Sequence, residues 1–204
     1  NIIDYGEKII FQSLNRLIIT DIGNKKFQFV PATNTLLKSF KVGNKIYFQE
    51  SGKGLYEVKS GKAFMVNNSQ ILKENVIVGL YKVEGKLLIL TDISGFYFLE
   101  NKRLKKWKID GEKSFQGNKL YCSLRLSDGS FAIGSISSGL IWMDAEGKVI
   151  MELNRANGIS NNTILSFFED QNKNLWLGLD NGNDCVNIKS PFLEYNEKKK
   201  KIGA

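Results

Sequence analysis

Apolar and polar residues alternate along most of the chain in short runs, and tight turns separate the runs. This pattern is typical of antiparallel β-strands. It is clearest between residues 119 and 153, where strands are predicted at 119–127, 130–135, 139–144 and 148–153. Asp-Gly and Glu-Gly dipeptides separate strands of this group, and Asp-Gly is a strong hairpin signal because glycine accepts the positive φ of the turn. Four consecutive hairpin-connected strands therefore form one structural unit.

The unit is repeated along the chain. Gly54, Gly95, Gly139 and Gly182 lie 41, 44 and 43 residues apart, and each closes a ten-residue block. The blocks read KIYFQESGKG, KLLILTDISG, SFAIGSISSG and KNLWLGLDNG, and they align without a gap. A period of about 40–45 residues built from short strands is typical of a β-propeller blade. The large apolar residues of these blocks are expected to pack between neighbouring blades: Tyr47, Ile89, Phe131 and Trp176.

The repeat predicts an all-β fold, a β-propeller of four-stranded antiparallel blades. The propeller segment is expected over residues 1–195, followed by a basic tail at 196–204. The blades are expected at about 1–31, 35–67, 75–109, 119–153 and 162–189. The first and last repeats show three strands each and the others four. About five repeats are fewer than the six or seven of a larger propeller, so we favour a partial propeller over a small closed ring. No long stretch has a helical period.

The hydrophobic content, the net charge and the length of the apolar runs limit the functions that the chain can have. Hydrophobic residues make up 42% of the chain, enough for a packed core. The net charge is +8, but Lys198–Lys201 supply four of these charges in one run and many other lysines flank turns. No basic face with interleaved aromatics is evident, so direct nucleic-acid contact is not expected. No apolar run is long enough to cross a membrane. The chain begins at Asn1 rather than Met, and we interpret it as a partial segment.

The chain has two cysteines, Cys122 and Cys185, and no histidine. We interpret the cysteines as small buried residues on inner strands, and a disulfide between them stays open. Two cysteines without histidine cannot build an ordinary structural zinc site.

The segment 157–182 carries a spaced set of small, polar and apolar residues: Gly158, Ser160, Asn161, Asn162, Thr163, Glu169, Asp170, Leu175, Trp176, Gly178 and Gly182. This pattern resembles the two-component regulator propeller repeat, and residues 125–150 look like the preceding blade of that family. Ile159, Asn174 and Leu179 are mild departures, and Asn183 stands where an apolar residue is expected.

The resemblance implies the periplasmic, extracytoplasmic sensor region of a bacterial inner-membrane regulator. In that family a triple-tyrosine domain, a transmembrane helix and a histidine kinase or LuxR-type DNA-binding output usually follow. The segment 186–192 is most similar to regulators with the LuxR-type output.

Catalytic constellations are nearly absent from the sequence. Without histidine, Ser-His-Asp and Cys-His arrangements cannot form. Glu169 and Asp170 are adjacent, so strand alternation points them to opposite faces. The segment 180–184 has the spacing of a calcium loop but lacks the late glutamate of an EF-hand. We therefore expect no enzyme activity, no catalytic residue, no cofactor and no metal.

A binding function would use the loops at one rim of the propeller. These loops carry hydroxyl, amide and carboxylate groups that suit a carbohydrate or another polar small ligand. The candidate residues are Glu50, Ser51, Lys53, Asp92, Ser94, Ser135, Ser137, Ser138, Asn161, Asn162, Asp180 and Asn181.

The favoured hypothesis is a non-catalytic sensor segment that acts through the adjacent domains of the same regulator. A protein–protein interaction scaffold and a propeller enzyme acting on polysaccharides are the alternatives. Exposed strand edges would favour self-association, for example as a homodimer.

Overall fold

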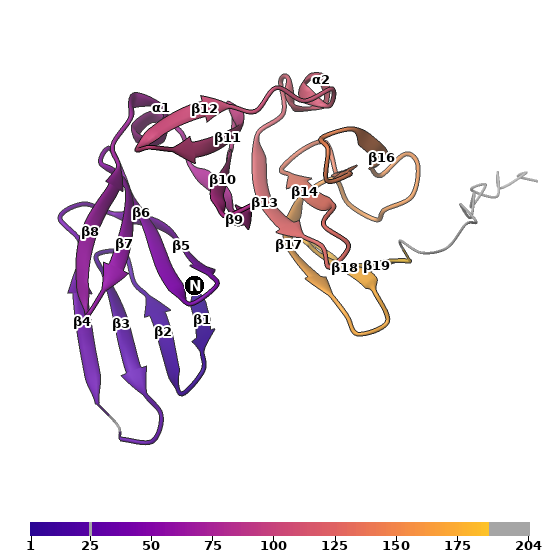
Figure 1. Cartoon of the computed structure of the whole chain (residues 1–204). Helices are drawn as coiled ribbons and strands as arrows, with labels where there is room; N and C mark the ends of the chain where they lie inside the picture. The colour runs from indigo at the N-terminus through magenta and orange to yellow at the C-terminus, as the bar shows by residue number, and fades with distance from the viewer. Residues whose placement is uncertain (25, 188–204) are drawn as a thin grey trace, which may run out of the picture. The chain divides into compact units, whose positions relative to one another are not determined.

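The computed structural model describes residues 1–24 and 26–187, so the last residues of the expected propeller segment and the basic tail lie outside the described residues. The described residues form five antiparallel β-sheets, each built from strands consecutive in sequence (Figure 1). They fall into two compact units, residues 1–108 and 109–204. We call the sheets blades 1 to 5 in chain order.

The first unit contains blades 1 to 3, each of four strands. Blade 1 consists of β1 (Ile2–Tyr5), β2 (Lys8–Gln12), β3 (Arg16–Asp21) and β4 (Phe27–Pro31). Blade 2 consists of β5 (Leu36–Val42), β6 (Lys45–Glu50), β7 (Gly54–Lys59) and β8 (Lys62–Asn67). After the short helix α1 (Gln70–Glu74), blade 3 consists of β9 (Ile77–Val83), β10 (Lys86–Thr91), β11 (Gly95–Glu100) and β12 (Arg103–Lys106).

The second unit begins with the one-turn helix α2 (Glu112–Phe115) and contains blades 4 and 5. Blade 4 consists of β13 (Leu120–Arg125), β14 (Phe131–Ser135), β15 (Leu140–Met143) and β16 (Val149–Leu153). Blade 5 consists of β17 (Ile164–Glu169), β18 (Asn174–Leu179) and β19 (Gly182–Asn187).

The predicted all-β architecture of antiparallel propeller blades is confirmed. One strand count was wrong, because blade 1 has four strands rather than three. The first residues form β1, in which Ile3 pairs with Ile10 and Tyr5 with Lys8. With only four residues, β1 is too short to show a clear alternating pattern. Up to Asn187, blade 5 has three strands, as predicted.

Blades that follow one another within a unit pack face to face. Successive side chains along a β-strand point to opposite faces of the sheet. Two adjacent residues of a blade's second strand therefore pack against different neighbouring blades. In β6, Phe48 belongs to the core shared with blade 1, whereas Tyr47 belongs to the core shared with blade 3. We call the face that packs on the preceding blade the leading face, and the face that packs on the following blade the trailing face.

The same division holds in the second unit. Ala132 lies on the trailing face of blade 4, and it shares a core with Leu175 and Leu177 on the leading face of blade 5. All three side chains are fully buried. Of the apolar residues expected between blades, Tyr47 and Ile89 are buried in the core that blades 2 and 3 share, and Phe131 is buried as well.

Trp176 differs from this expectation because it is 44% exposed. The register explains why. Cys122 pairs with Gly134 in blade 4, and Ser166 pairs with Gly178 at the same place in blade 5. Ala132 lies two residues before Gly134, and Trp176 lies two residues before Gly178, so the two occupy equivalent positions. Trp176 therefore lies on the trailing face of the last described blade. The gapless alignment of the four blocks was wrong for blade 5, whose loop before Gly182 is one residue shorter.

Candidate functional site

The candidate rim loops join the second and third strands of blades 2 and 3 in the first unit and of blades 4 and 5 in the second. The first residue after each second strand donates its backbone N–H to a carbonyl just before the inner strand of the same blade. These bonds run from Ser51 to Thr35 (2.9 Å), Asp92 to Val76 (2.8 Å), Ile136 to Lys119 (3.2 Å) and Asp180 to Thr163 (3.2 Å). Blades 2 to 5 therefore share one equivalent backbone hydrogen bond, which fixes the loop after the second strand next to the start of the inner strand.

Two of the three rim carboxylates next to the second strands, Glu50 and Asp92, are buried. Glu50 is 2% exposed and accepts hydrogen bonds from the Thr33 hydroxyl and the Asn34 backbone N–H. Asp92 is 4% exposed, and its Oδ1 accepts from the Val76 N–H at 2.9 Å. These acceptors satisfy backbone groups at the start of the inner strand. The carboxylates thus stabilise the blade and are not displayed to solvent.

The buried hydroxyls brace the rim loops. Ser135 Oγ donates to the Gly139 carbonyl at 3.3 Å and accepts from the Ser138 N–H at 2.6 Å. Thr91 makes the same pair of bonds in blade 3, to the Gly95 carbonyl at 3.0 Å and from the Ser94 N–H at 3.1 Å. Because two blades repeat the arrangement, it is a property of the loop fold.

Two asparagines that sequence reasoning missed complete these loops. Ser94 Oγ donates to Asn75 Oδ1 at 2.8 Å, and Ser138 Oγ donates to Asn118 Oδ1. Each asparagine also donates its amide to the carbonyl four residues earlier, Ile71 and Ser114 respectively. The signal in the sequence is an asparagine about 20 residues before each rim serine.

The loop that leads into blade 5 is also internally bonded. Asn161 Oδ1 accepts from the Thr163 N–H at 2.9 Å, and Asn162 Oδ1 accepts from the Arg155 N–H at 2.7 Å. The Asn162 carbonyl accepts from the Gly139 N–H of blade 4 at 3.0 Å. Thr163 Oγ1 donates to the Ile136 carbonyl at 2.7 Å. The rim loops of blades 4 and 5 are therefore brought side by side.

The structure divides the predicted rim residues into two groups. Glu50, Asp92, Ser94, Ser135, Ser138, Asn161 and Asn162 have side chains that bond within the rim loops. The side chains of Lys53, Ser137, Asp180 and Asn181 are exposed, and Ser51 is half-buried. Lys53, Ser137, Asp180 and Asn181 are therefore the rim candidates whose side chains are most accessible to a ligand.

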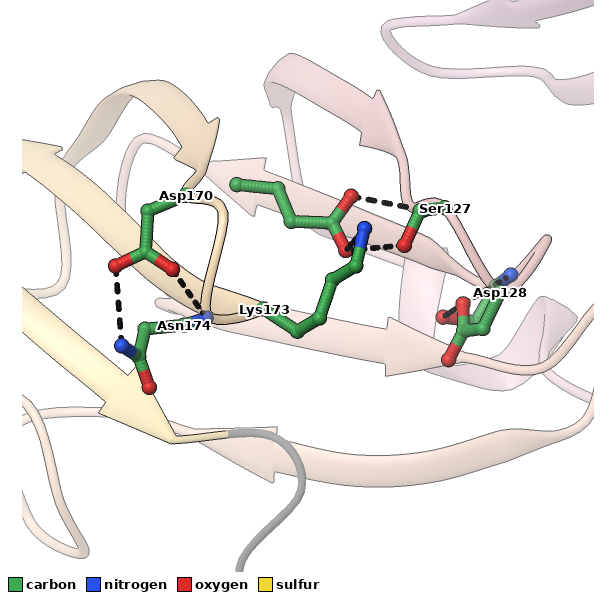
Figure 2. Close-up of polar contacts among 7 residues, drawn as sticks. Ser127, Asp128, Asp170, Lys173 and Asn174 are labelled. Atoms are coloured by element: carbon green, nitrogen blue, oxygen red, sulfur yellow. Dashed lines mark hydrogen bonds and ion pairs between the residues drawn. The ribbon is translucent and has the colours of Figure 1, made fainter.

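The acidic pair Glu169-Asp170 lies at the opposite end of β17 from the rim. Glu169 accepts from both the N–H and the hydroxyl of Ser127, at 2.8 and 2.6 Å, and lies 3.8 Å from the Lys173 ammonium. Ser127 follows β13 of blade 4, so its two bonds to Glu169 connect blades 4 and 5, whereas Lys173 contacts the same carboxylate from within blade 5 (Figure 2).

Asp170 serves a separate set of contacts within blade 5. It accepts from the backbone N–H and the side-chain amide of Asn174 at 2.9 and 3.0 Å (Figure 2), and from the indole N–H of Trp176 at 3.0 Å. These donors, led by Trp176, lower the pKa of Asp170 to about 2. Glu169 therefore bonds blade 5 to blade 4, whereas Asp170 bonds residues within blade 5.

The unusual Asn183-Asp184 pair has a structural role. Asp184 accepts from the Ser160 backbone N–H at 2.6 Å and from its hydroxyl at 2.7 Å. This bond ties the loop before blade 5 to β19. An apolar residue could not supply these bonds, which accounts for the aspartate at position 184.

Both cysteines are free thiols, and only one is buried as expected. Cys122 lies on the inner strand β13 and is 7% exposed. Cys185 lies on the third strand β19 and is exposed, so its interpretation as a buried inner-strand residue was wrong. Among the described residues, no three acidic or cysteine side chains gather closely enough to hold a metal ion. Up to Asn187, neither helix has the length and hydropathy of a membrane span.

Comparison with known proteins places one repeat in a family. Residues 158–181, which form most of the loop before blade 5 and its first two strands, match the family described as "Two component regulator propeller". No curated protein matches the chain.

Solved structures share the fold over nearly the whole chain. The extracellular domain of BT4673 from B. thetaiotaomicron, described both as a one component and as a hybrid two component system, superposes with a TM-score of 0.72 at 18% identity. The extracellular domain of BT3049 from the same organism, described as a hybrid two component system, gives 0.64 at 16% identity. The match covers 93% and 92% of this chain, and 27% and 26% of those chains. The chain thus spans about a quarter of their length.

The same fold also occurs in other contexts. A structure whose name suggests a gluconolactonase matches with a TM-score of 0.61 at 11% identity, over 88% of this chain and 72% of its own. At these identities the likeness establishes the propeller fold, and the site must supply the functional argument.

Proposed function

We propose that this chain is a non-catalytic, ligand-sensing propeller segment of the periplasmic region of a bacterial inner-membrane regulator. The observation that carries the proposal is the two-component regulator propeller repeat at residues 158–181, folded as a blade of the matching architecture. The likeness to extracellular domains of such systems supports it. The output is a histidine kinase or a LuxR-type DNA-binding domain.

The ligand that suits this rim is a carbohydrate or another polar small molecule. Asp180, Asn181 and Ser137 present a carboxylate, an amide and a hydroxyl in one unit, and the bond from Thr163 to Ile136 holds their two loops together. Hydroxyl-rich ligands need such mixed donors and acceptors. Because the loops are braced internally, a ligand would meet groups that are already ordered, which lowers the entropic cost of binding.

We expect signalling to depend on a difference in ligand affinity between two conformations of the regulator. A ligand that contacts the rim shifts the regulator only if it binds one arrangement of the propeller and the adjacent domains better than another. This mechanism needs no cofactor and no catalytic residue, so we expect the segment to leave its ligand unchanged.

The test is a binding screen with neutral and acidic oligosaccharides, read by amide chemical shifts and by thermal shift. We expect perturbed amides at residues 136–138 and 180–181, and loss of binding in Asp180→Ala and Asn181→Ala. Glu146→Ala is the matched control, because Glu146 is an exposed carboxylate in the β15–β16 turn, at the other end of blade 4. Shifts confined to residues away from the rim loops would contradict the proposed site. Turnover of an oligosaccharide would favour the enzyme alternative instead.

A further inference from the structure

The chain contains two Asn-Gly pairs, Asn157-Gly158 and Asn181-Gly182, and both asparagines are exposed. Asparagine followed by glycine is the dipeptide most prone to spontaneous deamidation. The backbone nitrogen of the second residue attacks the side-chain amide carbon of the first, and glycine leaves that nitrogen unhindered because it has no Cβ. In a folded chain the reaction therefore depends on what the side-chain amide and the attacking nitrogen contact.

The first pair is held by hydrogen bonds on each reacting group. Asn157 Oδ1 accepts from the Asn154 backbone N–H at 2.6 Å, and Asn157 Nδ2 donates to the Glu152 carbonyl at 3.1 Å. The Gly158 N–H, which would supply the nucleophile, donates to the Asn154 carbonyl at 3.0 Å. A Cβ added to Gly158 would lie 3.2 Å from the Leu153 side chain, so the loop is also closely packed. Attack at Asn157 requires these three bonds to break.

The second pair lacks these restraints on its side chain. Asn181 is the second residue of the two-residue turn between β18 and β19. Among the described residues, none forms a hydrogen bond with its side-chain amide. A Cβ added to Gly182 would meet nothing within 4 Å, so the space beside the glycine is open. The amide of Asn181 is therefore free to turn towards the Gly182 nitrogen.

The attacking nitrogen of the second pair lies at the end of a strand ladder. Gly182 pairs with Leu179, and this is the pair next to the turn. In the part of the chain that the structure describes, β19 pairs with β18 alone. Opening a loop or the end of a strand costs little free energy compared with global unfolding. A local opening therefore releases the Gly182 nitrogen, whereas at Asn157 the bonded loop has to open as well.

We propose that Asn181 is a site of spontaneous deamidation in the folded chain and that Asn157 is protected. Hydroxide removes the proton of the Gly182 nitrogen, which then forms a bond to Cγ of Asn181. The bond from Cγ to Nδ2 breaks, and Nδ2 takes a proton from water and leaves as ammonia. A second water opens the cyclic imide at either carbonyl, which gives aspartate or isoaspartate. The net reaction is hydrolysis of the amide and needs no oxidant or reductant.

The product alters the rim loop of blade 5. Asp180 and Asn181 form this turn, and both are exposed. Deamidation places a second carboxylate next to Asp180, and the isoaspartate form also lengthens the turn backbone by a methylene group. Any effect on a rim ligand rests on the proposed function, whereas the deamidation itself is independent of it.

Peptide mapping by mass spectrometry tests this inference, because trypsin separates the two sites. Cleavage places Asn157 in the peptide 156–173 and Asn181 in the peptide 174–189. The chain is incubated at mildly alkaline pH, both folded and in urea, and fragmentation spectra locate the new acid. In the folded chain we expect Asn181 to convert at least about tenfold faster than Asn157, because less structure has to open. In urea the two sites should convert at similar rates, because both are followed by glycine.

Asn181→Gln is the control variant, because attack on glutamine has to form a larger ring and is much slower. Ion-exchange chromatography should show an acidic form that accumulates in the folded wild type and in Asn157→Gln, but not in Asn181→Gln. Circular dichroism verifies that the variants fold. The proposal is overturned if Asn157 converts as fast as Asn181 in the folded wild type. It is also overturned if folded Asn181 stays intact over the time in which the chain in urea deamidates.

Discussion

The side chain of Gln49 in blade 2 accepts a hydrogen bond from the Ile77 backbone N–H of blade 3 at 2.7 Å. Its amide nitrogen donates to the Leu72 carbonyl at 2.9 Å and to the Asn75 carbonyl at 2.7 Å. Gln49 is fully buried, so one side chain satisfies three backbone groups at the junction of the two blades. Helix α1 and the start of β9 are positioned by this residue.

Replacing Gln49 should therefore destabilise the first unit. Gln49→Ala leaves the three backbone groups without their partner, and unpaired buried groups cost about 1–3 kcal/mol each where water cannot enter. We expect a loss of about 3 kcal/mol in the free energy of unfolding, measured in urea. Circular dichroism and tryptophan fluorescence, with Trp107 in the first unit, follow the unfolding transition.

Gln12→Ala is the matched control. Gln12 occupies the same strand position in blade 1, donates to the Leu36 carbonyl at 3.3 Å and accepts from the Ser39 hydroxyl at 2.8 Å. It is half-buried, so water can replace part of what is lost, and about 1 kcal/mol is expected. Equal losses in the two variants would contradict the role assigned to Gln49.

The bond between Glu169 and Ser127 should couple blades 4 and 5. Glu169→Ala removes the acceptor of both Ser127 donors, and we expect about 1.5 kcal/mol of destabilisation, because hydrogen bonds to charged groups are stronger than neutral ones. Ser127→Ala keeps the backbone bond and should cost about half as much. Urea unfolding followed by Trp142 and Trp176 measures both.

Lys173→Ala is the control for the charge alone. Its ammonium lies 3.8 Å from Glu169 and its side chain is 37% exposed, so the pair should contribute no more than about 0.5 kcal/mol. If Lys173→Ala costs as much as Glu169→Ala, the ion pair within blade 5, rather than the hydrogen bonds to Ser127 of blade 4, accounts for the stabilisation by Glu169.

Two closing glycines with positive φ should differ in their tolerance of alanine. Gly139 has φ 83°, and an added Cβ would lie 2.1 Å from the Leu153 carbonyl oxygen. Gly182 has φ 98°, and its added Cβ would meet nothing within 4 Å. Gly182→Ala should cost about 1–2 kcal/mol from the backbone conformation alone, and Gly139→Ala clearly more, because the end of β16 must also shift. Thermal unfolding of the two variants gives the comparison, and equal melting temperatures would contradict it.

Asp170 should make stability depend on pH in the acid range. Its pKa is lowered to about 2 in the folded chain, so the ionised form contributes stability above its unfolded value of about 3.9. That contribution is lost as the pH falls from about 4 towards 2. We expect Asp170→Asn to melt below the wild type at pH 7, and the difference to shrink over that window. A difference that stays constant between pH 5 and 2 would contradict the lowered pKa.

How far the sequence predicts the site depends on the residue. The hairpin turns and strand alternation locate the rim loops correctly, because these signals are local. The sequence does not show that Glu50 and Asp92 are buried acceptors whereas Asp180 is exposed. That difference depends on which backbone groups of the preceding loop lie within hydrogen-bond distance, and 16 residues separate Asp92 from Val76.

The sequence alone determined that the chain is a repeat of antiparallel blades. The signals for this are local, because turn dipeptides, strand alternation and the spacing of the closing glycines each depend on residues close together in the chain. Only the tertiary structure decided which face of each blade is covered. Trp176 and Ala132 occupy equivalent positions, yet one is 44% exposed and the other fully buried. The physical reason is that a sheet buries a face only against a neighbouring sheet, and that neighbour is supplied by residues far away in the chain.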